Sequence, residues 1–490
     1  MKVSKNKKAT RRSFLKKSAL AASSVYIVPR YVLGGPGYTA PSDRINLAAI
    51  GAGGKGRSDI RHASNEGMEN VIALCDVDFS GNASEAVAEH PKAKRYHDYR
   101  IMLDEEKDIE AVTISTPDHT HAPAAVYAME RGIHVYVQKP MAHNIRETRI
   151  LTEMAREKQL VTQMGNQGGS NPLLGMVQDW VDSGRLGKIA KVQVWTNRPV
   201  WPQGIPTPGP APSEMPESLK WDLWLGPASE RAYRPSLHPF AWRGWWDFGT
   251  GALGDVGCHL IDIPFRTLGL RYPKDAECSV GTLYAPGQGM VYNDEGCPAS
   301  SFITLHFDAT DKSKAPIEMT WSDGGIRPAH PDAIPPDHDI GGRNSQNGVL
   351  IIGEHGVIST NINDSSPLMP KLYMNDGTTE FGPENEDGFE PEYGHQRKWI
   401  EACKAGYDSA AHRALTSSFD YAGPMTETVL MGNLAIRSYM LRREITDGDR
   451  KRMEYYGRKK LLWDGENTRI TNFEAANQFV TREYRKGWEV

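Results

Sequence analysis

A glycine-rich loop between an apolar strand and a helix constrains the fold of this chain more than any other feature. Residues 45–50 form a short apolar run that predicts a buried strand. Residues 51–56 follow directly as Gly-Ala-Gly-Gly-Lys-Gly, which matches the G-x-G-x-x-G pattern. In that pattern Gly51 permits a tight turn, Gly53 lets a pyrophosphate approach the backbone, and Gly56 lets helix and strand pack closely. The loop therefore predicts a dinucleotide-binding turn that opens a helix, whose first N–H groups face the phosphates.

An acidic residue after the next strand supports this interpretation. The apolar run 71–75 ends at Asp76, about 20 residues after the glycine loop, where a carboxylate accepts hydrogen bonds from the adenosine ribose. A carboxylate at that place also repels a 2′-phosphate, so NAD is the expected cofactor. Lys55 and Arg57 lie close enough in the sequence to keep NADP open as an alternative.

Predicted strands and helices alternate up to residue 167. Further strands are predicted at 111–115, 134–137 and 160–164, and a helix at 122–131 is closed by a glycine. This alternation is typical of an α/β domain with a doubly wound parallel sheet, here over residues 43–167. Such a sheet binds its ligand at the carboxyl ends of the strands. The residues that follow the strands, and that we expect at one edge, are Gly53, Asp76, Pro117, Lys139 and Asn166.

The second part of the chain follows a different pattern. After residue 167 the alternation fades, and a loop at 197–243 that is rich in Pro and Trp is too long for a plain connection. Several strands then follow one another with few helices between them, which predicts an α+β domain with an open mixed, largely antiparallel sheet over residues 168–445. Residues 446–490 are a polar and aromatic C-terminal extension. The predicted strands are 188–196, 276–284, 300–307, 317–321 and 349–358.

Two further motifs give the chain a specific resemblance. Residues 116–121 read Thr-Pro-Asp-His-Thr-His, and residues 138–140 read Gln-Lys-Pro. Together they resemble the signature of the glucose–fructose oxidoreductase/inositol dehydrogenase/MocA (Gfo/Idh/MocA) family, in which Glu usually stands where this chain has Gln138. The Asp-x-x-x-His run from Asp255 to His259 resembles the second signature of that family. The resemblance covers both predicted domains.

The resemblance assigns catalytic roles to three residues. On a helix, Asp255 and His259 are one turn apart and share a face, so the carboxylate can orient the imidazole. From the residues alone, a helix-start Asp and a core His explain the pattern more simply. The resemblance instead implies that His259 is a general acid/base, that Asp255 holds it, and that Lys139 hydrogen-bonds the reacting oxygen.

The remaining candidate site residues come from the first domain and the long loop. The expected cofactor contacts are Gly51, Gly53, Gly54, Gly56, Asp76, Thr116, Pro117, His119, Gln138, Lys139 and Asn166. The candidate substrate residues are Arg198, Trp201, His238, Arg243 and Trp246, with packing inside the loop as the alternative. His119 and His121 have H-x-H spacing but no third ligand of convincing spacing, so we expect no metal.

The resemblance implies an enzyme that transfers hydride between a nicotinamide cofactor and a hydroxyl or carbonyl group of a sugar or polyol. Some family members are NAD-dependent glycosidases that act by transient oxidation, elimination and re-reduction, and this activity is the alternative. Members related to the α-N-acetylgalactosaminidases lack the Lys-Pro and Asp-x-x-x-His motifs, which favours the oxidoreductase. A non-catalytic secreted sugar-binding protein is the second alternative.

The first 40 residues predict an export signal. They carry nine cations and no acid, and Arg11-Arg12 precede a short apolar stretch at residues 18–28. This arrangement resembles the twin-arginine signal, and the stretch is too short to cross a bilayer. We expect export to the periplasm by the twin-arginine machinery, without a stable membrane anchor. Because that machinery carries folded proteins, the cofactor would be inserted before export and bound tightly.

Charge and composition narrow the partners. The net charge is −4 and the cations concentrate in the first 40 residues, so the rest of the chain is acidic, which argues against nucleic acid. The expected small-molecule partner is a sugar or polyol. The resemblance also implies that the open sheet of the second domain packs on further copies of the chain, in a homodimer or homotetramer.

Overall fold

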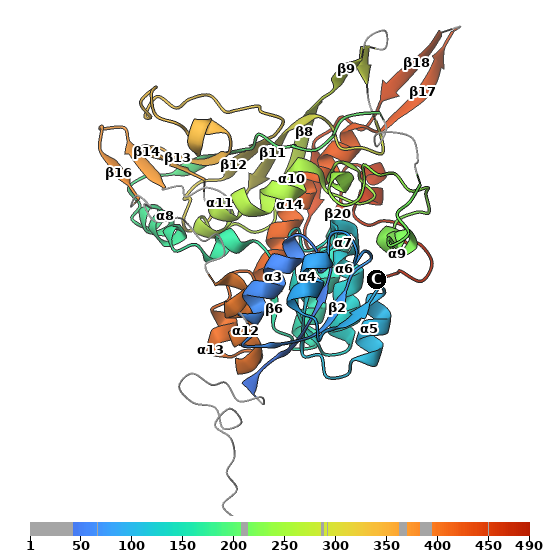
Figure 1. Ribbon diagram of the computed structural model, residues 1–490. Helices are drawn as coiled ribbons and strands as arrows, with labels where there is room; N and C mark the ends of the chain where they lie inside the picture. Colours follow the sequence, from blue (N-terminus) through green and yellow to red (C-terminus); the bar gives the residue numbers. More distant parts are fainter. Residues whose placement is uncertain are drawn as a thin grey trace, which may run out of the picture. The chain divides into compact units, whose positions relative to one another are not determined.

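The computed structural model describes residues 43–65, 67–206, 214–285, 289–291, 293–361, 370–382, 394–448 and 450–490 (Figure 1). The predicted export signal at residues 1–40 lies outside the described residues. Residues 45–490 form one unit. Within the described part of the chain, no helix is long and apolar enough to cross a membrane.

The first domain is built on a parallel sheet of six described strands in the order β3-β2-β1-β4-β5-β6. The order reverses between β1 and β4, which is the switch point where doubly wound sheets bind their ligands. The prediction of a doubly wound parallel sheet is confirmed. The strands are β1 (Asn46–Ile50), β2 (Asn70–Cys75), β3 (Lys94–Tyr96), β4 (Ala111–Ile114), β5 (His134–Val137) and β6 (Thr162–Met164). The helices between them are α3 (Lys55–Ser64), α4 (Ser84–Glu89), α5 (Tyr99–Glu105), α6 (Asp118–Glu130) and α7 (Ile145–Glu157).

The glycine loop joins β1 to α3 with the geometry that its sequence predicts. Gly51 has a φ of 78°, a left-handed conformation that favours glycine. A Cβ on Gly56 would lie 1.8 Å from the carbonyl oxygen of Gly51, so a side chain there would push α3 away from the loop. The loop and the first turn of α3 can therefore pack this closely only because Gly56 has no side chain.

The second domain carries a sheet of ten described strands in the order β16-β15-β14-β13-β7-β12-β11-β8-β19-β20. Its neighbours are antiparallel except for β7 and β12, so the prediction of a mixed, largely antiparallel sheet is confirmed. The strands are β7 (Ile189–Trp195), β8 (Asp275–Gly281), β11 (Ser300–Phe307), β12 (Ile317–Ser322), β13 (Gly348–Gly353), β14 (Gly356–Thr360), β15 (Lys371–Met374), β16 (Thr379–Phe381), β19 (Leu461–Asp464) and β20 (Arg469–Ile470).

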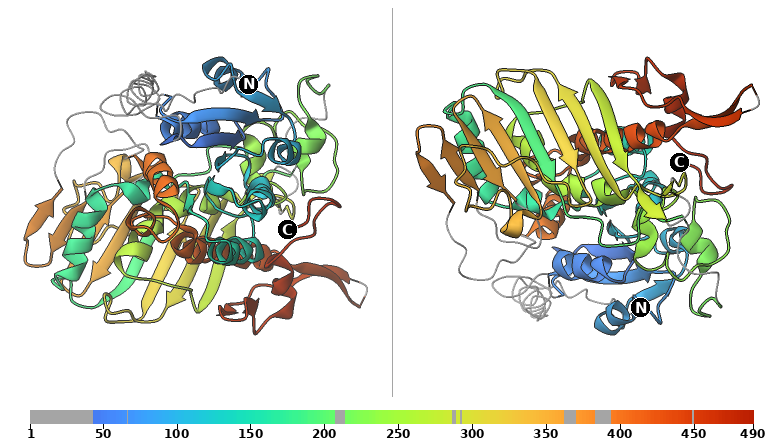
Figure 2. Two further views of the ribbon diagram at one scale, coloured as in Figure 1. Left: turned by 90° about the horizontal axis from the view of Figure 1, so that it is seen from below. Right: turned by 90° about the horizontal axis from the view of Figure 1, so that it is seen from above.

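Helices cover one face of this sheet, and Figure 2 shows the other face uncovered in the view from above. The longest helix, α14 (Phe419–Tyr439), packs along β8 and β11 and is buried over most of its length. Further helices of this domain are α8 (Leu173–Asp182), α9 (Trp221–Leu225), α10 (Gly251–Leu260) and α11 (Asp262–Thr267). Two hairpins complete it, β9 (Leu283–Ala285) with β10 (Gly289–Val291) and β17 (Arg442–Asp447) with β18 (Arg450–Tyr455).

Two late segments cross the domain limits that the sequence indicated. Helices α12 (His395–Ala405) and α13 (Ala410–Arg413) fall within the range 168–445, yet α12 packs against α3 and β5 of the first domain. Gln396 of α12 donates a hydrogen bond to buried Asp59 of α3, over 2.9 Å. The C-terminal extension contributes β19 and β20 to the large sheet. Packing over such sequence distances leaves no local pattern, so the sequence assigned both segments by position alone.

Candidate active site

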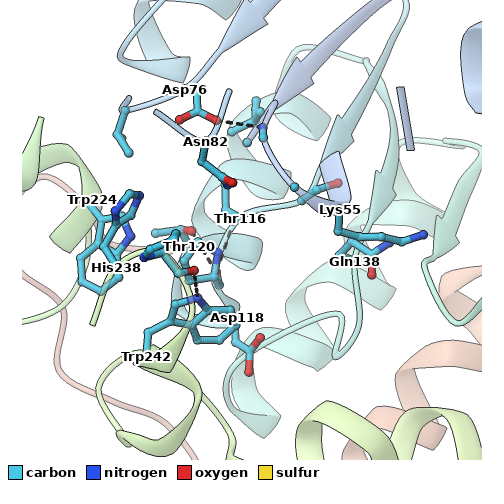
Figure 3. A pocket seen from close by; sticks show the side chains of 18 of the residues that line it. Lys55, Asp76, Asn82, Thr116, Asp118, Thr120, Gln138, Trp224, His238 and Trp242 are labelled. Atoms are coloured by element: carbon cyan, nitrogen blue, oxygen red, sulfur yellow. Dashed lines mark hydrogen bonds between the residues drawn. The ribbon is translucent and has the colours of Figure 1, made fainter. Parts of the chain in front are cut away.

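One cavity of about 590 Å³ lies at the carboxyl edge of the parallel sheet (Figure 3). Residues of the long loop at 197–243 and of α10 form its other side. Its two ends have different linings. The nucleotide end is lined by Gly51, Gly53, Gly54, Asp76, Asn82, His97, Asp98, Tyr99 and Trp488. The reaction end is lined by Asp118, Gln138, Lys139, Arg198, Arg243, Asp255 and His259. The predicted edge of the sheet therefore does border a cavity.

Asp76 anchors the glycine loop at the nucleotide end. Its Oδ2 accepts hydrogen bonds from the backbone N–H groups of Ala52, over 2.8 Å, and Gly53, over 3.2 Å. Its Oδ1 accepts from the N–H of Asp78 over 3.0 Å. Burial raises the pKa of Asp76, and these three hydrogen bonds oppose that rise by stabilising the charged form. The carboxylate lines the cavity at the place where the sequence predicts a ribose contact.

The residues around the loop fit a dinucleotide. A Cβ on Gly53 would lie 2.6 Å from atoms of Asn82, so a side chain there would displace Asn82, which lines the cavity. Helix α3 begins after Gly54 without a side-chain cap and without an acid in its first turn. The positive end of its dipole therefore lies at the glycine loop, where it suits a pyrophosphate.

Lys139, Asp255 and Arg243 form an ion cluster at the reaction end. The Lys139 Nζ lies 3.0 Å from the Asp255 Oδ1 and also donates to the Asp255 backbone carbonyl. The Arg243 Nε lies 3.1 Å from the same Oδ1. Burial alone would raise the pKa of Asp255, but the charges of Lys139 and Arg243 outweigh it and hold that pKa below its ordinary value. Asp255 is therefore ionised and fixes two cations beside the cavity.

This cluster adds to the role that the sequence predicted for Asp255. The Asp-x-x-x-His spacing predicts that Asp255 holds His259, and the structure shows that the same carboxylate pairs with Lys139 and Arg243. Asp255 and His259 lie on α10 as predicted, one turn apart, and both line the cavity.

His259 lies in the wall of the same cavity. It is on the last turn of α10 and is 8% exposed, which leaves its ring within reach of a molecule in the cavity but shielded from bulk water. Lys139 comes from the loop after β5, more than 100 residues earlier. The three predicted catalytic residues are therefore gathered at one end of one cavity.

Asp118 is an acidic residue of the site that the sequence analysis did not single out. Its Oδ2 accepts hydrogen bonds from the Thr250 Oγ1, over 2.6 Å, and from the Thr250 N–H, over 3.1 Å. Burial raises its pKa to about 6, against the opposing effects of Thr250, Arg243 and Lys139. Asp118 stands inside the Thr-Pro-Asp-His-Thr-His motif, so its signal was present, but nothing local distinguished it from a helix-start acid.

Gln138, the departure from the Glu-Lys-Pro pattern, has a clear partner. Its side-chain Nε2 donates to the Oδ2 of Asp59 over 2.9 Å. Asp59 is fully buried on α3 and also accepts from Ser115 Oγ over 2.7 Å and from Gln396. A Glu at position 138 would bring two carboxylates together here, so Asp59 requires an amide donor at this place. Gln138, in place of the usual Glu, therefore keeps the hydrogen bonds beside Lys139 satisfied.

Three predicted cofactor contacts, Gly56, His119 and Asn166, do not line the cavity. The ring of His119 is fully buried, donates through Nε2 to the Trp224 carbonyl over 3.0 Å and packs on Phe248. Burial lowers its pKa to about 3, so it is neutral. Asn166 is also fully buried and does not line the cavity, whereas its neighbour Gln167 does. Each sits next to a lining residue, and sequence position alone could not tell which neighbour faces inward.

The predicted substrate residues divide in a similar way. Arg198, His238 and Arg243 line the cavity. Trp201 instead donates to the side chain of Gln203 and packs edge-on against Phe240. Trp246 lines a separate small cavity beside His143. The aromatic residues that do line the main cavity, and that the sequence analysis missed, are Tyr99, Trp224, Phe240, Trp242 and Trp488.

The fold and the cavity define a two-domain, dinucleotide-binding protein of the Rossmann class. Residues 45–166 match the model of the Gfo/Idh/MocA oxidoreductase family, described as an NAD-binding Rossmann fold. Residues 176–280 match the C-terminal alpha/beta domain of the same oxidoreductase family. Over these two ranges the chain matches both domains of the Gfo/Idh/MocA family, and its first domain matches an NAD-binding Rossmann fold.

Curated relatives share parts of this chain. Levoglucosan dehydrogenase of Pseudarthrobacter phenanthrenivorans is 26% identical over 201 residues, 40% of this chain and 41% of that protein. A glycosyl hydrolase family 109 protein of Shewanella pealeana is 30% identical over 205 residues, 37% of this chain and 44% of that protein. The chain thus spans less than half the length of these relatives.

Solved structures share the fold over a longer stretch. An inositol dehydrogenase homolog from Azotobacter vinelandii complexed with NAD+ aligns with a TM-score of 0.56 at 17% identity. The alignment covers 80% of this chain and 95% of that one. Levoglucosan dehydrogenase in complex with NADH and levoglucosan aligns with a TM-score of 0.54 at 17% identity, over 80% and 97% of the two chains.

Proposed function

We propose that this protein is an NAD-dependent oxidoreductase that oxidises a hydroxyl group of a sugar or polyol, or reduces the corresponding carbonyl. The observation that carries the proposal is the single cavity with a glycine loop and Asp76 at one end and Lys139, Asp255 and His259 at the other. A hydride acceptor held at the first end and proton-transfer groups held at the second are the two requirements of alcohol oxidation.

The side chains divide the reaction between them. A bound NAD supplies the hydride acceptor. As the substrate's C–H electron pair leaves as hydride, its O–H proton passes to His259, and the C–O bond becomes a carbonyl. Lys139, paired with Asp255, donates a hydrogen bond to the reacting oxygen and stabilises the negative charge that develops there. Arg243 shares the Asp255 carboxylate and keeps Lys139 from being fully neutralised by it.

The lining supports a polyhydroxylated substrate. The rings of Trp224 and Trp242 and the side chains of His238 and Arg198 line the cavity. Flat apolar rings beside a few polar groups suit a sugar, whose C–H face packs on an aromatic ring while its hydroxyls bond polar side chains. Relatives named for levoglucosan and inositol dehydrogenases point to the same class.

The proposal also covers the export of the protein, the retention of its cofactor and its oligomeric state. The twin-arginine pattern in residues 1–40 supports export to the periplasm by that machinery. A compartment without free dinucleotide would require that NAD be held tightly and that a second substrate restore its oxidation state. The uncovered face of the ten-stranded sheet supports a homodimer or homotetramer (Figure 2).

A glycosidase is the second candidate function. The relative that is 30% identical is named a glycosyl hydrolase family 109 protein. In that reaction, transient oxidation of a ring carbon acidifies the neighbouring C–H bond, the glycosidic bond is eliminated, water adds, and re-reduction restores the ring carbon. The same Lys139 and His259 would serve the two redox steps. Net hydrolysis consumes no external oxidant.

One experiment separates the possibilities. The purified protein, loaded with NAD+, is mixed with a panel of sugars, polyols and aryl glycosides while absorbance at the reduced-nicotinamide band is followed. A sugar that produces the band, and a carbonyl compound that then removes it, support the oxidoreductase. Release of the aryl group without a lasting band supports the glycosidase. Binding of sugar with neither response rejects both enzymes and leaves a sugar-binding protein.

A further inference from the structure

The last ten residues of the chain contribute one side chain to the wall of the nucleotide end. Residues 481–490 are exposed or half-buried except for Trp488, which is 7% exposed. Trp488 lines the cavity together with Asp98 and Tyr99, beside Asp76. Its ring meets the Tyr99 ring at 6.1 Å, and the Arg100 guanidinium lies 4.0 Å from its centroid. A mostly exposed tail thus buries one large aromatic residue at a binding site.

Polar contacts fasten this tail to both sides of the cavity. On the side of the first domain, Arg482 pairs with Glu147 over 2.6 Å and donates to the His119 carbonyl over 2.6 Å. On the side of the long loop, Arg485 donates to the carbonyls of Gly226, over 2.8 Å, and Asp222, over 2.7 Å.

A third contact lies at the tip of the tail. Arg100 of α5 donates to the Gly487 carbonyl over 3.0 Å, next to Trp488. Figure 1 shows the C-terminus beside α5. The tail therefore bridges α5, α6 and α7 of the first domain and the segment formed by α9 and Gly226, and it carries Trp488 between them.

We propose that residues 481–490 form a strap that retains the dinucleotide, with Trp488 as the wall that closes the adenosine end of its site. The strap extends the function proposed above and rests on it. Asp76 marks the adenosine end, because its carboxylate is placed for the ribose. A dinucleotide that fills the cavity cannot leave past Trp488 until the strap releases its contacts on one side.

The strap serves to retain the bound dinucleotide. The ring of Trp488 is already fixed by its contacts. It therefore adds contact area for the dinucleotide, and no loose segment has to become ordered on binding. The Arg482 and Arg485 contacts lie outside the cavity lining, so they fasten the strap without touching the ligand. The strap should therefore slow dissociation of the cofactor more than it changes the chemistry at Lys139.

The test measures the rate at which NADH leaves the full-length protein. Protein loaded with NADH is mixed with a large excess of NAD+, and nicotinamide fluorescence, excited directly, reports the release. We expect Trp488→Ala to release NADH at least 10-fold faster than the unmodified protein. Lys486→Ala is the matched control, because Lys486 is an exposed residue of the same segment that does not line the cavity. Its release rate should equal that of the unmodified protein.

A second variant guards against a folding defect. Arg482→Ala/Arg485→Ala removes fastening contacts and leaves Trp488 in place, and it should also accelerate release at least several-fold. Circular dichroism and thermal unfolding identify any variant that fails to fold. Equal release rates for unmodified protein, the Trp488 variant and the double variant would overturn the strap. Failure of the unmodified protein to bind NADH at all would instead overturn the proposed function.

Discussion

The two ends of the cavity are built in different ways. At the nucleotide end, every lining residue except Trp488 falls within residues 51–99, and Asp76 accepts hydrogen bonds from the glycine loop. The reaction end joins Lys139 of the first domain to Asp255 and Arg243 of the second. The first end uses backbone N–H groups and absent side chains. The second uses charged side chains that neutralise one another.

This difference teaches that binding and chemistry are separable in this protein. The expected phosphate site at the nucleotide end consists of backbone groups of one short loop. An ion cluster shared by two domains positions a proton donor only when both domains are packed together. Changes at the nucleotide end should therefore alter retention of the cofactor, and changes at the reaction end should alter turnover.

The largest effect should come from Lys139→Met, which keeps the length of the side chain and removes its charge. The developing negative charge on the substrate oxygen loses its donor, and Asp255 keeps only Arg243 as a partner. We expect turnover to fall by about 10³-fold, as for removal of a key electrostatic donor. Steady-state kinetics with the best sugar of the panel measures it. The Kd for NADH should stay within about 3-fold of its starting value, and a parallel loss of NADH binding would refute the separation of the two ends.

A second carboxylate beside Asp59, introduced at position 138, should lower the stability of the fold. Gln138→Glu puts a second acid beside Asp59, and two buried carboxylates in contact cannot both ionise without a cost. We expect the free energy of unfolding to fall by about 2 kcal/mol at pH 8, because Lys55 Nζ, 3.5 Å from the Asp59 Oδ1, offsets only part of the added buried charge. Urea unfolding checks it.

An exchange of the two groups is the control for that prediction. Asp59→Asn combined with Gln138→Glu restores one carboxylate and one amide to the pair. Stability close to that of the unmodified protein would show that the charge, and not the shape of residue 138, caused the loss. A double variant as unstable as Gln138→Glu alone would contradict the explanation.

At the nucleotide end, Asp76→Ala should weaken cofactor binding with little effect on turnover at saturation. The glycine loop loses the acceptor for the N–H groups of Ala52 and Gly53, and the ribose loses its expected partner. We expect the Kd for NADH to rise by about 10- to 100-fold, since each hydrogen bond to a charged group contributes about 1.5–3 kcal/mol. The preference for NADH over NADPH should shrink, as titrations with both cofactors would reveal. An unchanged preference would argue against the ribose contact.

The smallest effect concerns Asp118 at the reaction end. Its pKa is raised from 3.8 to about 6, so the folded state binds its proton more tightly than the unfolded state does. The stability that it contributes is fully present below pH 3.8 and is lost as pH rises through 6. Between pH 5 and pH 8 the loss amounts to about 1 kcal/mol.

Asp118→Asn tests this assignment, because the amide oxygen can still accept from Thr250 but does not titrate. The difference in unfolding free energy between unmodified protein and variant should shift by about 1 kcal/mol, against the unmodified protein, from pH 5 to pH 8. Exposed Asp179→Asn is the matched control and should show no such shift. A difference that is flat across this pH range would mean that Asp118 is not protonated at pH 5.

The elements that were predicted correctly depend on residues close together in the sequence, and those that were missed depend on residues far apart. The strands of the parallel sheet and the turn at Gly51 were predictable because apolar runs and positive φ are properties of a few consecutive residues. The packing of α12 on the first domain was not, since it depends on contacts such as Gln396 with Asp59, more than 300 residues apart. For the site, Lys139 and His259 were found through their motifs.

The sequence by itself determined the parallel sheet, its glycine loop and the acid that follows β2, because each rests on local steric rules and on hydrogen bonds between near neighbours. Only the tertiary structure decided that Asp255 pairs with Lys139, that Asp118 lies buried beside them, and that Trp488 closes the far end of the cavity. The physical reason is that ion pairs and burial depend on which surfaces meet, and residues more than 100 positions apart carry no local trace of that meeting.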